Sequence, residues 1–296
     1  MVALIPKKAG TDSATPSKRR RPAAIGTVAL AVPLALILLV TLIGPWIVPF
    51  DPTKVVGAPS LSPDSQFLLG TDSNGLDVFS RTIAGARIDV TIALAVTIAA
   101  TMGGILIGLI IGMNEAGRGL GGFLARAAAR FLDLLEAVPT VIVALVVVSF
   151  FGTSSITMIF TLSIILAPIQ ARLVRTEVLR VRGDAYLDVA RQAGLSETQL
   201  VFRHVLPNSS VPALQNASVV FGMTIILTAA LGFLGVGLPP PTPEWGSMIT
   251  RGAGDAAIGK LWSAGAPALA LCLTVASVAV VGRRLTKGTR RSHLQP

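Results

Sequence analysis

Long apolar runs alternate with short polar connections along the whole chain. A run of about 20 mostly apolar residues is long enough to cross a bilayer as a helix. The pattern predicts six such helices, at roughly 24–48, 88–113, 123–150, 155–174, 210–238 and 261–282. Because the apolar residues come in blocks and not in the periodic scatter of a globular domain, the pattern predicts an all-α polytopic membrane protein.

Charge indicates the orientation of these helices. Hydrophobic residues make up 52% of the chain, charged residues 14%, and the net charge is +10. A net charge of +10 would suggest a nucleic-acid partner in a soluble protein, but 20 of the 25 Lys and Arg residues lie on one predicted side of the membrane. By the positive-inside rule, both termini and the 175–207 connection are expected in the cytoplasm. The basic charge therefore reports orientation and not nucleic-acid binding.

The connections between the spans predict how the chain is organised. We expect a basic cytoplasmic tail over 1–23, a first membrane helix over 24–48, and an extracytoplasmic loop with an interfacial helix over 49–87. Residues 88–284 would form a core of five membrane helices, followed by a cytoplasmic tail over 285–296. The first apolar run is about twice the length of a signal-peptide core and has no small-residue cleavage site, so we expect it to be retained.

One polar connection, residues 186–207, has a strong helical pattern. Tyr186, Val189, Ala190 and Ala193 follow the i, i+3, i+4, i+7 spacing of one helix face. Gly194 supplies the left-handed residue at which such a helix commonly stops. The first half of the connection is therefore predicted to be an amphipathic helix.

A second helix is predicted immediately after this stop. Ser196 and Gln199 have the spacing of a capping box, and Leu195 and Leu200 stand at the positions of a hydrophobic staple around it. Pro207 is expected to end this helix. A simple solvated loop would not need two capped helices, so the pattern favours a coupling element.

The connection resembles a motif of the inner-membrane subunits of ATP-binding-cassette importers: Glu-Ala-Ala, three residues, Gly, nine residues, a variable residue, then x-Leu-Pro. Asp and Val replace the usual Glu and first Ala, and the spacing is intact. The matching positions here are Asp188, Val189, Ala190, Gly194, Leu206 and Pro207.

The resemblance implies a type I importer permease fold whose coupling loop, over 182–207, docks into a cleft of a cytoplasmic ATPase. Apolar side chains would supply the contact area, and Asp188 would orient the contact by a charge-assisted hydrogen bond. The residues expected to couple to the ATPase are Tyr186, Asp188, Val189, Ala190, Gly194, Leu200, Val201, His204 and Pro207.

Two outer segments narrow the resemblance. Residues 69–81 resemble the Leu-Gly-Thr-Asp, x, x, Gly-Arg-Asp-Val, x, Ser-Arg signature in the second permease subunit of dipeptide and oligopeptide importers, with Leu76 in place of the usual Arg. The Pro-rich segment 239–260 resembles that subfamily's Pro-Pro-Thr-Pro-Glu-Trp-Gly stretch, on the side where a substrate-binding protein docks. Outer residues with a structural role, or facing that protein, are expected to be Gly70, Thr71, Asp72, Asp77, Pro243, Glu244 and Trp245.

The outer residues also allow other roles. Asp72, Asn74 and Asp77 could be calcium ligands, but Ile83 stands where a calcium loop needs a bidentate Glu, so capping is favoured. Trp245 could contact the binding protein, but an anchor at the bilayer surface is favoured.

Ionisable residues stand near the cytoplasmic end of the third predicted span, at Arg130, Asp133 and Glu136. Charged groups inside a span are costly and usually face a partner helix or a wet cavity. This set could lie beside the pathway or gate. Alternatively, Arg130 and Asp133 could form an i, i+3 pair at the headgroup level.

Together the motifs imply a permease subunit of an ATP-driven importer in the cytoplasmic membrane of a prokaryote, with peptides as the favoured substrate. Nickel chelates, glutathione and haem-like ligands are alternatives. Implied partners are a second homologous permease in a heterodimer, two ATP-binding subunits or domains, and an extracytoplasmic substrate-binding protein. ATP and Mg would be used by the partners, with no cofactor or metal bound by this chain.

Two rival classes fit the sequence less well. An ion-driven secondary transporter would predict inverted repeats and ionisable groups near the midplane of the membrane. An intramembrane enzyme would need paired catalytic residues within the spans. Neither pattern is visible in the sequence, which predicts a non-catalytic subunit.

Overall fold

The computed structural model describes residues 23–292, so 1–22 and 293–296 of the two predicted tails lie outside the described residues. Regular structure in the described range is helical apart from one isolated bridge between Thr71 and Asp77. The helices are α1 (Ala23–Ile47), α2 (Val78–Asn114), α3 (Leu120–Ala137), α4 (Thr140–Phe151), α5 (Ser155–Arg182), α6 (Ala185–Gln192), α7 (Glu197–Leu200), a π-helical turn η1 (Val201–Val205), α8 (Leu206–Phe233), α9 (Trp245–Ala257) and α10 (Trp262–Ser292).

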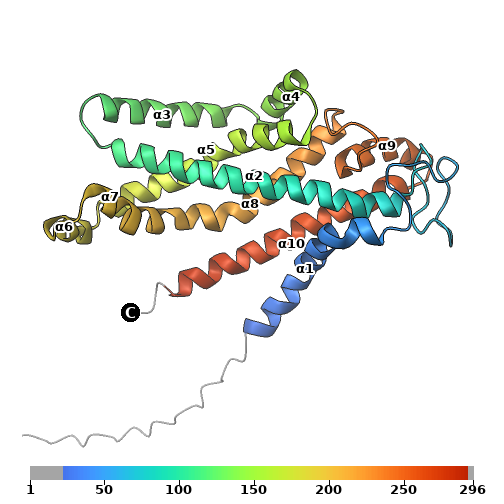
Figure 1. Cartoon of the computed structure of the whole chain (residues 1–296), viewed down its shortest axis with the longest axis horizontal. Helices are drawn as coiled ribbons and strands as arrows, with labels where there is room; N and C mark the ends of the chain where they lie inside the picture. Colours follow the sequence, from blue (N-terminus) through green and yellow to red (C-terminus); the bar gives the residue numbers. More distant parts are fainter. Residues whose placement is uncertain (1–22, 293–296) are drawn as a thin grey trace, which may run out of the picture.

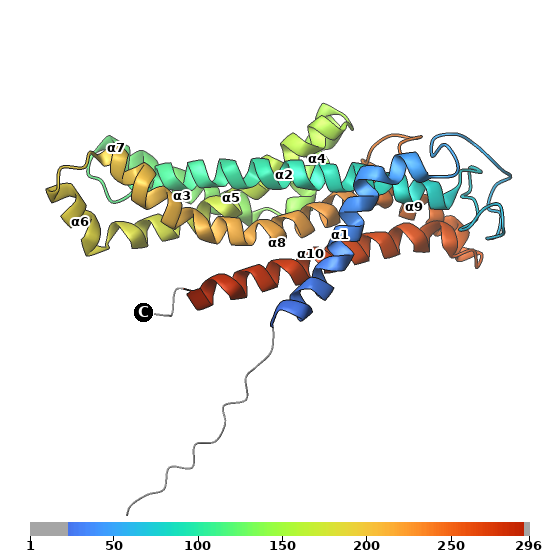
Figure 2. The ribbon, with the colours of Figure 1, turned by 60° about the horizontal axis from the view of Figure 1, so that its bottom comes forward.

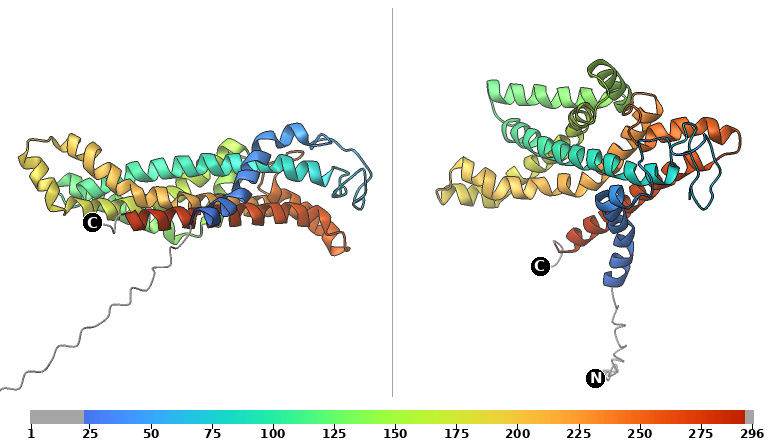
Figure 3. Two further views of the ribbon diagram at one scale, coloured as in Figure 1. Left: turned by 90° about the horizontal axis from the view of Figure 1, so that it is seen from below. Right: turned by 45° about the vertical axis from the view of Figure 1, so that its right-hand side comes forward.

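The long helices run along one axis of an elongated molecule. The α6 and α7 helices lie at one end, and the 48–77 loop lies with α9 at the other (Figure 1). The α1 helix crosses obliquely against α2 and α10 (Figure 2). Figure 3, which views the molecule from two further sides, keeps the same separation of the two ends. The coupling segment and the outer segments are therefore far apart, as their sequence resemblances imply.

The all-α polytopic fold is confirmed. Within the described residues, four helical segments are long and apolar enough to span a membrane, or five if a bent pair counts as one span. The described apolar part of α1, Val32–Ile47, is shorter than these. The four segments are Val78–Asn114, Ser155–Arg182, Glu197–Phe233 and Trp262–Arg284.

The third predicted span is not one continuous helix. The α3 and α4 helices meet at an angle of 91° between Ala137 and Thr140. Pro139 has no backbone N–H, and Val138 before it is extended (φ −85°, ψ 133°), as residues before proline usually are. Continuous apolarity over 123–150 suggested a single helix, whereas the proline breaks it.

Helical structure also begins earlier than predicted on the outer side. The interfacial helix expected within 49–87 and the span expected from 88 are one continuous helix, α2. Its start is fixed by Asp77, whose Oδ2 accepts a hydrogen bond from the Ser80 N–H at 2.7 Å. The outer loop therefore ends at 77.

Pro207 does not end a helix, contrary to the prediction. It lies in the first turn of α8, and helical structure continues from Glu197 to Phe233. The π-helical turn η1 precedes it, with the Leu206 N–H donating to the carbonyl of Val201. Because the first turn of a helix tolerates a missing N–H, proline fits where the π-helical turn gives way to α8.

The closest packing joins α2 to α5. Gly104, Gly108 and Gly112 repeat every four residues, so they form one stripe along α2. A Cβ added at Gly108 would overlap the carbonyl oxygen of Ala171, and one at Gly112 would lie 2.8 Å from Cβ of Val178. The stripe therefore lets the two backbones approach closely, as small residues do in membrane helix pairs.

A buried amide ties the third core helix to this pair. Gln170 of α5 donates from Nε2 to Thr101 Oγ1 (2.8 Å) and to the Ala213 carbonyl (3.1 Å). Its Oε1 accepts a hydrogen bond from Asn216 Nδ2 at 3.1 Å. Both ends of the amide are satisfied, so Gln170 holds α2, α5 and α8 in one register without leaving a buried polar group unpaired.

The α2–α5 packing predicts a clear contrast between two glycines of one helix. Gly108→Val should overpack the crossing and cost about 1–3 kcal/mol. Gly103→Val is the matched control, because nothing lies within 4 Å of a Cβ added there. Thermal unfolding of the detergent-solubilised variants would measure the difference, and equal unfolding temperatures would contradict the packing.

Candidate functional site

The coupling element, defined here as residues 185–205, follows directly from α5. After Arg182 the chain turns through Gly183 and Asp184 into α6. The only fully buried side chain of α6 is Leu187, at 1% exposure. On the predicted face, Tyr186 (42%), Val189 (64%) and Ala193 are exposed, whereas Ala190 is half-buried. The predicted apolar face is therefore available to a partner, and a different residue anchors the helix.

The end of α6 is a Schellman motif. Gly194 has φ +89°, which confirms the predicted left-handed stop. Its N–H donates to the Arg191 carbonyl at 3.0 Å, and the Leu195 N–H donates to the Ala190 carbonyl at 3.2 Å. These are the two bonds that define the motif. They fix the direction in which the chain leaves α6.

The start of α7 is the predicted capping box. The Gln199 N–H donates to Ser196 Oγ, and the Ser196 N–H donates to Gln199 Oε1 at 3.0 Å. Leu195 and Leu200 pack in one apolar cluster, as the staple requires. Both capping devices read from the sequence are confirmed.

Leu200 belongs to the interior and not to a contact surface. It is 1% exposed and packs with Leu187, Val205 and residues of α5 such as Val178 and Val181. Its predicted role as contact area for an ATPase is therefore wrong. Val201 is half-buried, and Ala190 packs against the same cluster.

The structure adds Phe202 to the exposed apolar residues, at 65% exposure. It lines a cavity of about 330 Å³ together with Leu195, Gln199 and Arg203. The predicted apolar contact residues of the second helix were Leu200 and Val201, and Phe202 was not among them. Tyr186, Val189 and Phe202 are named the coupling face below.

A salt-bridge pair joins the two coupling helices. Arg191 of α6 contacts Asp188 Oδ1 through Nη1 and Glu197 Oε1 through Nε, both at 2.8 Å. Such exposed pairs contribute little stability. They restrict the angle between α6 and α7. Asp188 is therefore already hydrogen-bonded inside the element. In the predicted contact with the ATPase, Asp188 would either keep this bond to Arg191 and accept a second one, or exchange it for a bond to the ATPase.

His204 and Tyr186 connect the element to α8. Their rings lie edge to face, with centroids 6.0 Å apart. Asn208 of α8 donates from Nδ2 to the Tyr186 hydroxyl at 3.3 Å and to the His204 carbonyl at 2.8 Å. Pro207 lies beside this cluster, at the start of α8. His204 and Asn208 therefore hold Tyr186 of the coupling face in place against α8.

The base of the element is held to the end of α2. Arg175 of α5 forms a bidentate pair with Glu115, at 2.6 and 2.7 Å, and this pairing lowers the pKa of Glu115. Arg182 donates to the last carbonyls of α2, those of Gly112 (3.0 Å) and Met113 (2.5 Å). Bidentate and charge-assisted bonds of this kind are the stronger ones. The α2 and α5 ends are thus connected just before the coupling element.

The charged residues near the third span pair with Arg172, which the sequence analysis did not consider as their partner. Arg172 of α5 pairs with Asp133 at 3.3 Å and more closely with Glu136. Arg130 is exposed and forms no ion pair with Asp133 among the described residues. The alternative of an Arg130–Asp133 pair is therefore wrong. The two carboxylates attach α3 to α5.

At the outer end, the predicted capping residues do cap. Asp72 Oδ1 accepts the N–H groups of Asn74 (2.8 Å) and Leu76 (3.0 Å), and Asp77 begins α2. Thr71 Oγ1 accepts the Leu61 N–H at 2.9 Å and donates to a loop carbonyl. The carboxylates therefore organise the outer loop, which agrees with capping in preference to calcium binding. Gly70, at φ +68°, provides the turn before them.

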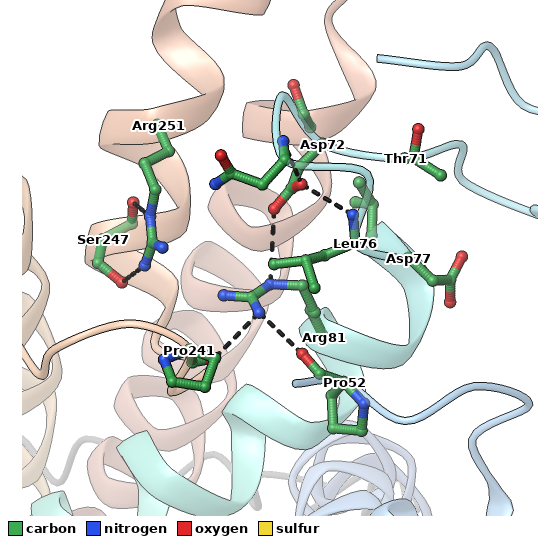
Figure 4. Close-up of polar contacts among 12 residues, drawn as sticks. Pro52, Thr71, Asp72, Leu76, Asp77, Arg81, Pro241, Ser247 and Arg251 are labelled. Atoms are coloured by element: carbon green, nitrogen blue, oxygen red, sulfur yellow. Dashed lines mark hydrogen bonds and ion pairs between the residues drawn. The ribbon is translucent and has the colours of Figure 1, made fainter. Parts of the chain in front are cut away.

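Arg81 holds the outer segments together, a role that the sequence analysis missed. Its guanidinium is fully buried and donates from Nη1 to the carbonyls of Pro52 (2.8 Å) and Pro241 (3.0 Å) (Figure 4). Asp72 Oδ2 lies 3.8 Å from Nε. Arg81 thus links α2, the 48–77 loop and the Pro-rich segment.

Trp245 is buried, at 2% exposure. Its backbone N–H donates to Asp89 Oδ2 and its Nε1 donates to the Thr82 carbonyl, both at 3.0 Å. Both roles considered for it, an anchor at the bilayer surface and a contact with a binding protein, are therefore wrong. It packs α9 against α2.

Glu244 and Pro243 are buried beside it. The Glu244 carboxylate caps α9 by accepting the N–H groups of Gly246 (2.7 Å) and Ser247 (2.9 Å). Burial raises the pKa of Glu244, while these hydrogen bonds and the charge of Arg251 oppose that shift. The outer set is structural and does not itself form an exposed docking surface.

Comparisons with known proteins agree with this geometry. Residues 104–291 match the family described as "Binding-protein-dependent transport system inner membrane component". The di/tripeptide transport system permease protein DppC of Pseudomonas aeruginosa is 34% identical, over 84% of this chain and 82% of its own. The glutathione transport system permease protein GsiD of Escherichia coli is 34% identical, over 83% of this chain and 80% of its own.

Two further comparisons concern a third relative and the fold. The probable D,D-dipeptide transport system permease protein DdpC of Escherichia coli is 31% identical, over 86% of this chain and 84% of its own. A chain of the MetNI methionine ABC transporter, solved in an inward-facing conformation, superposes with a TM-score of 0.51. It covers 67% of this chain and 93% of its own at 21% identity, which supports the fold alone.

Alanine substitutions on the buried face and on the exposed face of the coupling element should differ in their cost to stability. Leu200→Ala would leave a cavity in the cluster and should cost about 2–5 kcal/mol. Val189→Ala, on the exposed face, should change stability by less than about 0.5 kcal/mol. Amide hydrogen exchange over 185–205 would measure both. Faster exchange in Val189→Ala than in Leu200→Ala would show that the faces are assigned the wrong way round.

Proposed function

The chain belongs to the family of binding-protein-dependent transport system inner membrane components, and we propose that it is a permease subunit of an importer that moves short peptides across the cytoplasmic membrane of a prokaryote. ATP hydrolysis in partner subunits drives this transport, and the present chain is a non-catalytic component. The names of the relatives support a peptide substrate, and glutathione is the second candidate because GsiD is as similar as DppC.

The observation that carries the proposal is the coupling face. Tyr186, Val189 and Phe202 are exposed on helices whose ends are fixed by a Schellman motif and a capping box. Large apolar side chains at the aqueous end of a membrane protein would otherwise be in water, and such clusters mark protein interaction sites. We assign this face to the ATPase subunit.

The proposed topology has six spans with both termini in the cytoplasm. It takes α1 as the first span and the bent α3–α4 pair as the third, in addition to the four apolar segments. Two features support it: the distribution of Lys and Arg, and the separation of the coupling element from the outer loop along the long axis.

In this proposal the functional complex contains a second homologous permease, two ATP-binding subunits or domains, and an extracytoplasmic binding protein. Exposed apolar side chains on α4 and the start of α5 support a further membrane-embedded contact, with Phe150, Phe151 and Ile156 the most exposed. A single chain with six spans does not enclose a peptide-sized pathway by itself. The second permease would complete it as a heterodimer.

Closure of the ATPase pair would move the coupling element, and the element would move α5 and α8 with it. The Arg182 and Arg175 bonds transmit that motion to α2. Transport would then be a rigid-body alternation between inward-facing and outward-facing states.

The composition of the complex tests the proposed function. A pull-down from the native membrane, with mass spectrometry and an ATPase assay, should recover a second permease, an ATPase and a binding protein. Isolation of the chain alone, with uptake driven by an ion gradient in liposomes, would replace the importer with a secondary transporter.

A charge placed on the coupling face should uncouple transport. Val189→Asp would bury a carboxylate in an apolar contact, and we expect uptake and recovery of the ATPase to fall at least tenfold with the chain still in the membrane. Thr198→Asp is the control, because Thr198 is exposed on α7 outside the coupling face. Normal ATPase recovery with Val189→Asp would remove the coupling face from the proposal.

A further inference from the structure

A cavity of about 290 Å³ with a mainly apolar lining and a few polar side chains lies at the outer end of the molecule. Its walls are the C-terminal end of α8 and the glycine- and proline-rich residues 235–240. Three residues of α9, Ser247, Thr250 and Arg251, also line it, together with Thr153 from the connection between α4 and α5. The stretch 232–251 and the distant residue Thr153 therefore meet around one space, and none of the structural roles described above requires it.

Arg251 is held in a fixed orientation at this cavity. Its Nε donates to the Ser247 carbonyl at 3.2 Å, and its Nη2 donates to Ser247 Oγ at 3.0 Å. Within residues 23–292, Nη1 makes no hydrogen bond and the guanidinium forms no ion pair. One donor edge of the group is therefore free to meet a ligand.

A second guanidinium stands behind the first. Arg81 is fully buried, and its Nη2 has no hydrogen-bond partner in the described chain. In Figure 4 this nitrogen points toward the side occupied by Ser247 and Arg251. A buried cation with an unpaired donor is costly, and it attracts a negative group into its surroundings.

The neighbouring carboxylates form no close ion pair with either guanidinium, because each is engaged elsewhere. Asp72 approaches Arg81 only at 3.8 Å and already accepts two backbone N–H groups. Glu244 is engaged by the N–H groups of Gly246 and Ser247. Asp89 accepts the Trp245 N–H. Glu244 is close enough for the charge of Arg251 to act on it, but no described carboxylate lies within ion-pair distance of Arg251. The Nη1 edge of Arg251 therefore has no direct anionic partner in the described chain.

We propose that this cavity receives the terminal carboxylate of a short peptide on the outer side of the membrane. Arg251 would bind the carboxylate through its free edge, with the Thr153 hydroxyl beside it, and Arg81 would add positive potential from behind. The Thr250 hydroxyl already donates to the carbonyls of Phe233 and Gly246 and takes no part. The volume suits a terminal carboxylate with one residue and leaves the rest of the peptide outside. The inference rests on the proposed function and adds that substrates need a free carboxylate.

The test uses the complete importer in lipid nanodiscs without its binding protein, so that the binding protein cannot impose its own selection. Binding of radiolabelled dialanine is competed with unlabelled dialanine and with dialanine amide. The wild type should prefer dialanine at least tenfold. Arg251→Gln should lose this preference, and Arg251→Lys should retain part of it because it keeps the charge.

Lys54→Gln is the matched control. It removes an outer cation that is exposed and pairs only with Asp51, away from the cavity, and it should keep the full preference. Equal competition by dialanine and its amide in the wild type would overturn the proposal. So would an undiminished preference in Arg251→Gln.

A second readout separates this inference from the proposed function. Stimulation of ATPase activity by the binding protein without peptide should persist in Arg251→Gln. Its loss there would mean that the cavity takes a carboxylate of the binding protein and not of the peptide, which would also overturn the inference. Absence of stimulation in the wild type would instead count against the importer function itself.

Discussion

The close approach of α2 to α5 is the constraint on which the other contacts depend. Three glycines at four-residue spacing leave no side chain at the points of closest approach between the two backbones, over 104–112 of α2. Close packing of this kind replaces the hydrophobic effect, which does not drive helix association inside lipid. Gln170 can then reach Thr101 and α8 at once. A wider spacing would leave its amide unpaired in the core.

Both ends of the molecule are built on the same α2–α5 pair. At one end Arg175 and Arg182 fasten α5 to the last turn of α2, immediately before the coupling element. At the other end Arg81, near the start of α2, fixes the outer loop and the Pro-rich segment. In the proposed mechanism, a displacement of the coupling element would therefore be passed along rigid helices and not absorbed in a flexible loop. The outer cavity lies beside the segment that Arg81 holds.

Local signals in the sequence were sufficient for the features that depend on few neighbouring residues. The stop at Gly194, the box at Ser196 and the cap at Asp77 each satisfy backbone groups within one turn, so their residue types determine them. The apolar runs likewise fixed the all-α class. The 91° bend at Pro139 was missed because apolarity alone does not distinguish a continuous span from a broken one.

Tertiary contacts decided the remaining features. Leu200 and Trp245 are apolar residues in segments expected at the surface, and each is buried against an element distant in sequence. Arg81 is a charged residue in the interior. Its burial depends on contacts with Pro52, Asp72 and Pro241, which come from segments that meet only in the folded chain. Of the three exposed apolar residues named the coupling face, Tyr186 and Val189 were predicted as contact residues, and their exposure agrees with that prediction. The exposure of Phe202 could not be predicted, because it depends on the π-helical turn η1, which no local pattern indicates.

The most direct test of the account is a cross-link at the coupling face. The chain has one cysteine, Cys272, so a variant with Ser at that position accepts single new cysteines. A short bifunctional thiol reagent applied to the assembled complex should join Val189→Cys to the ATPase subunit. Val55→Cys, exposed in the outer loop, should give no such product. A cross-link to the ATPase from position 55, or none from 189, would contradict the proposed coupling.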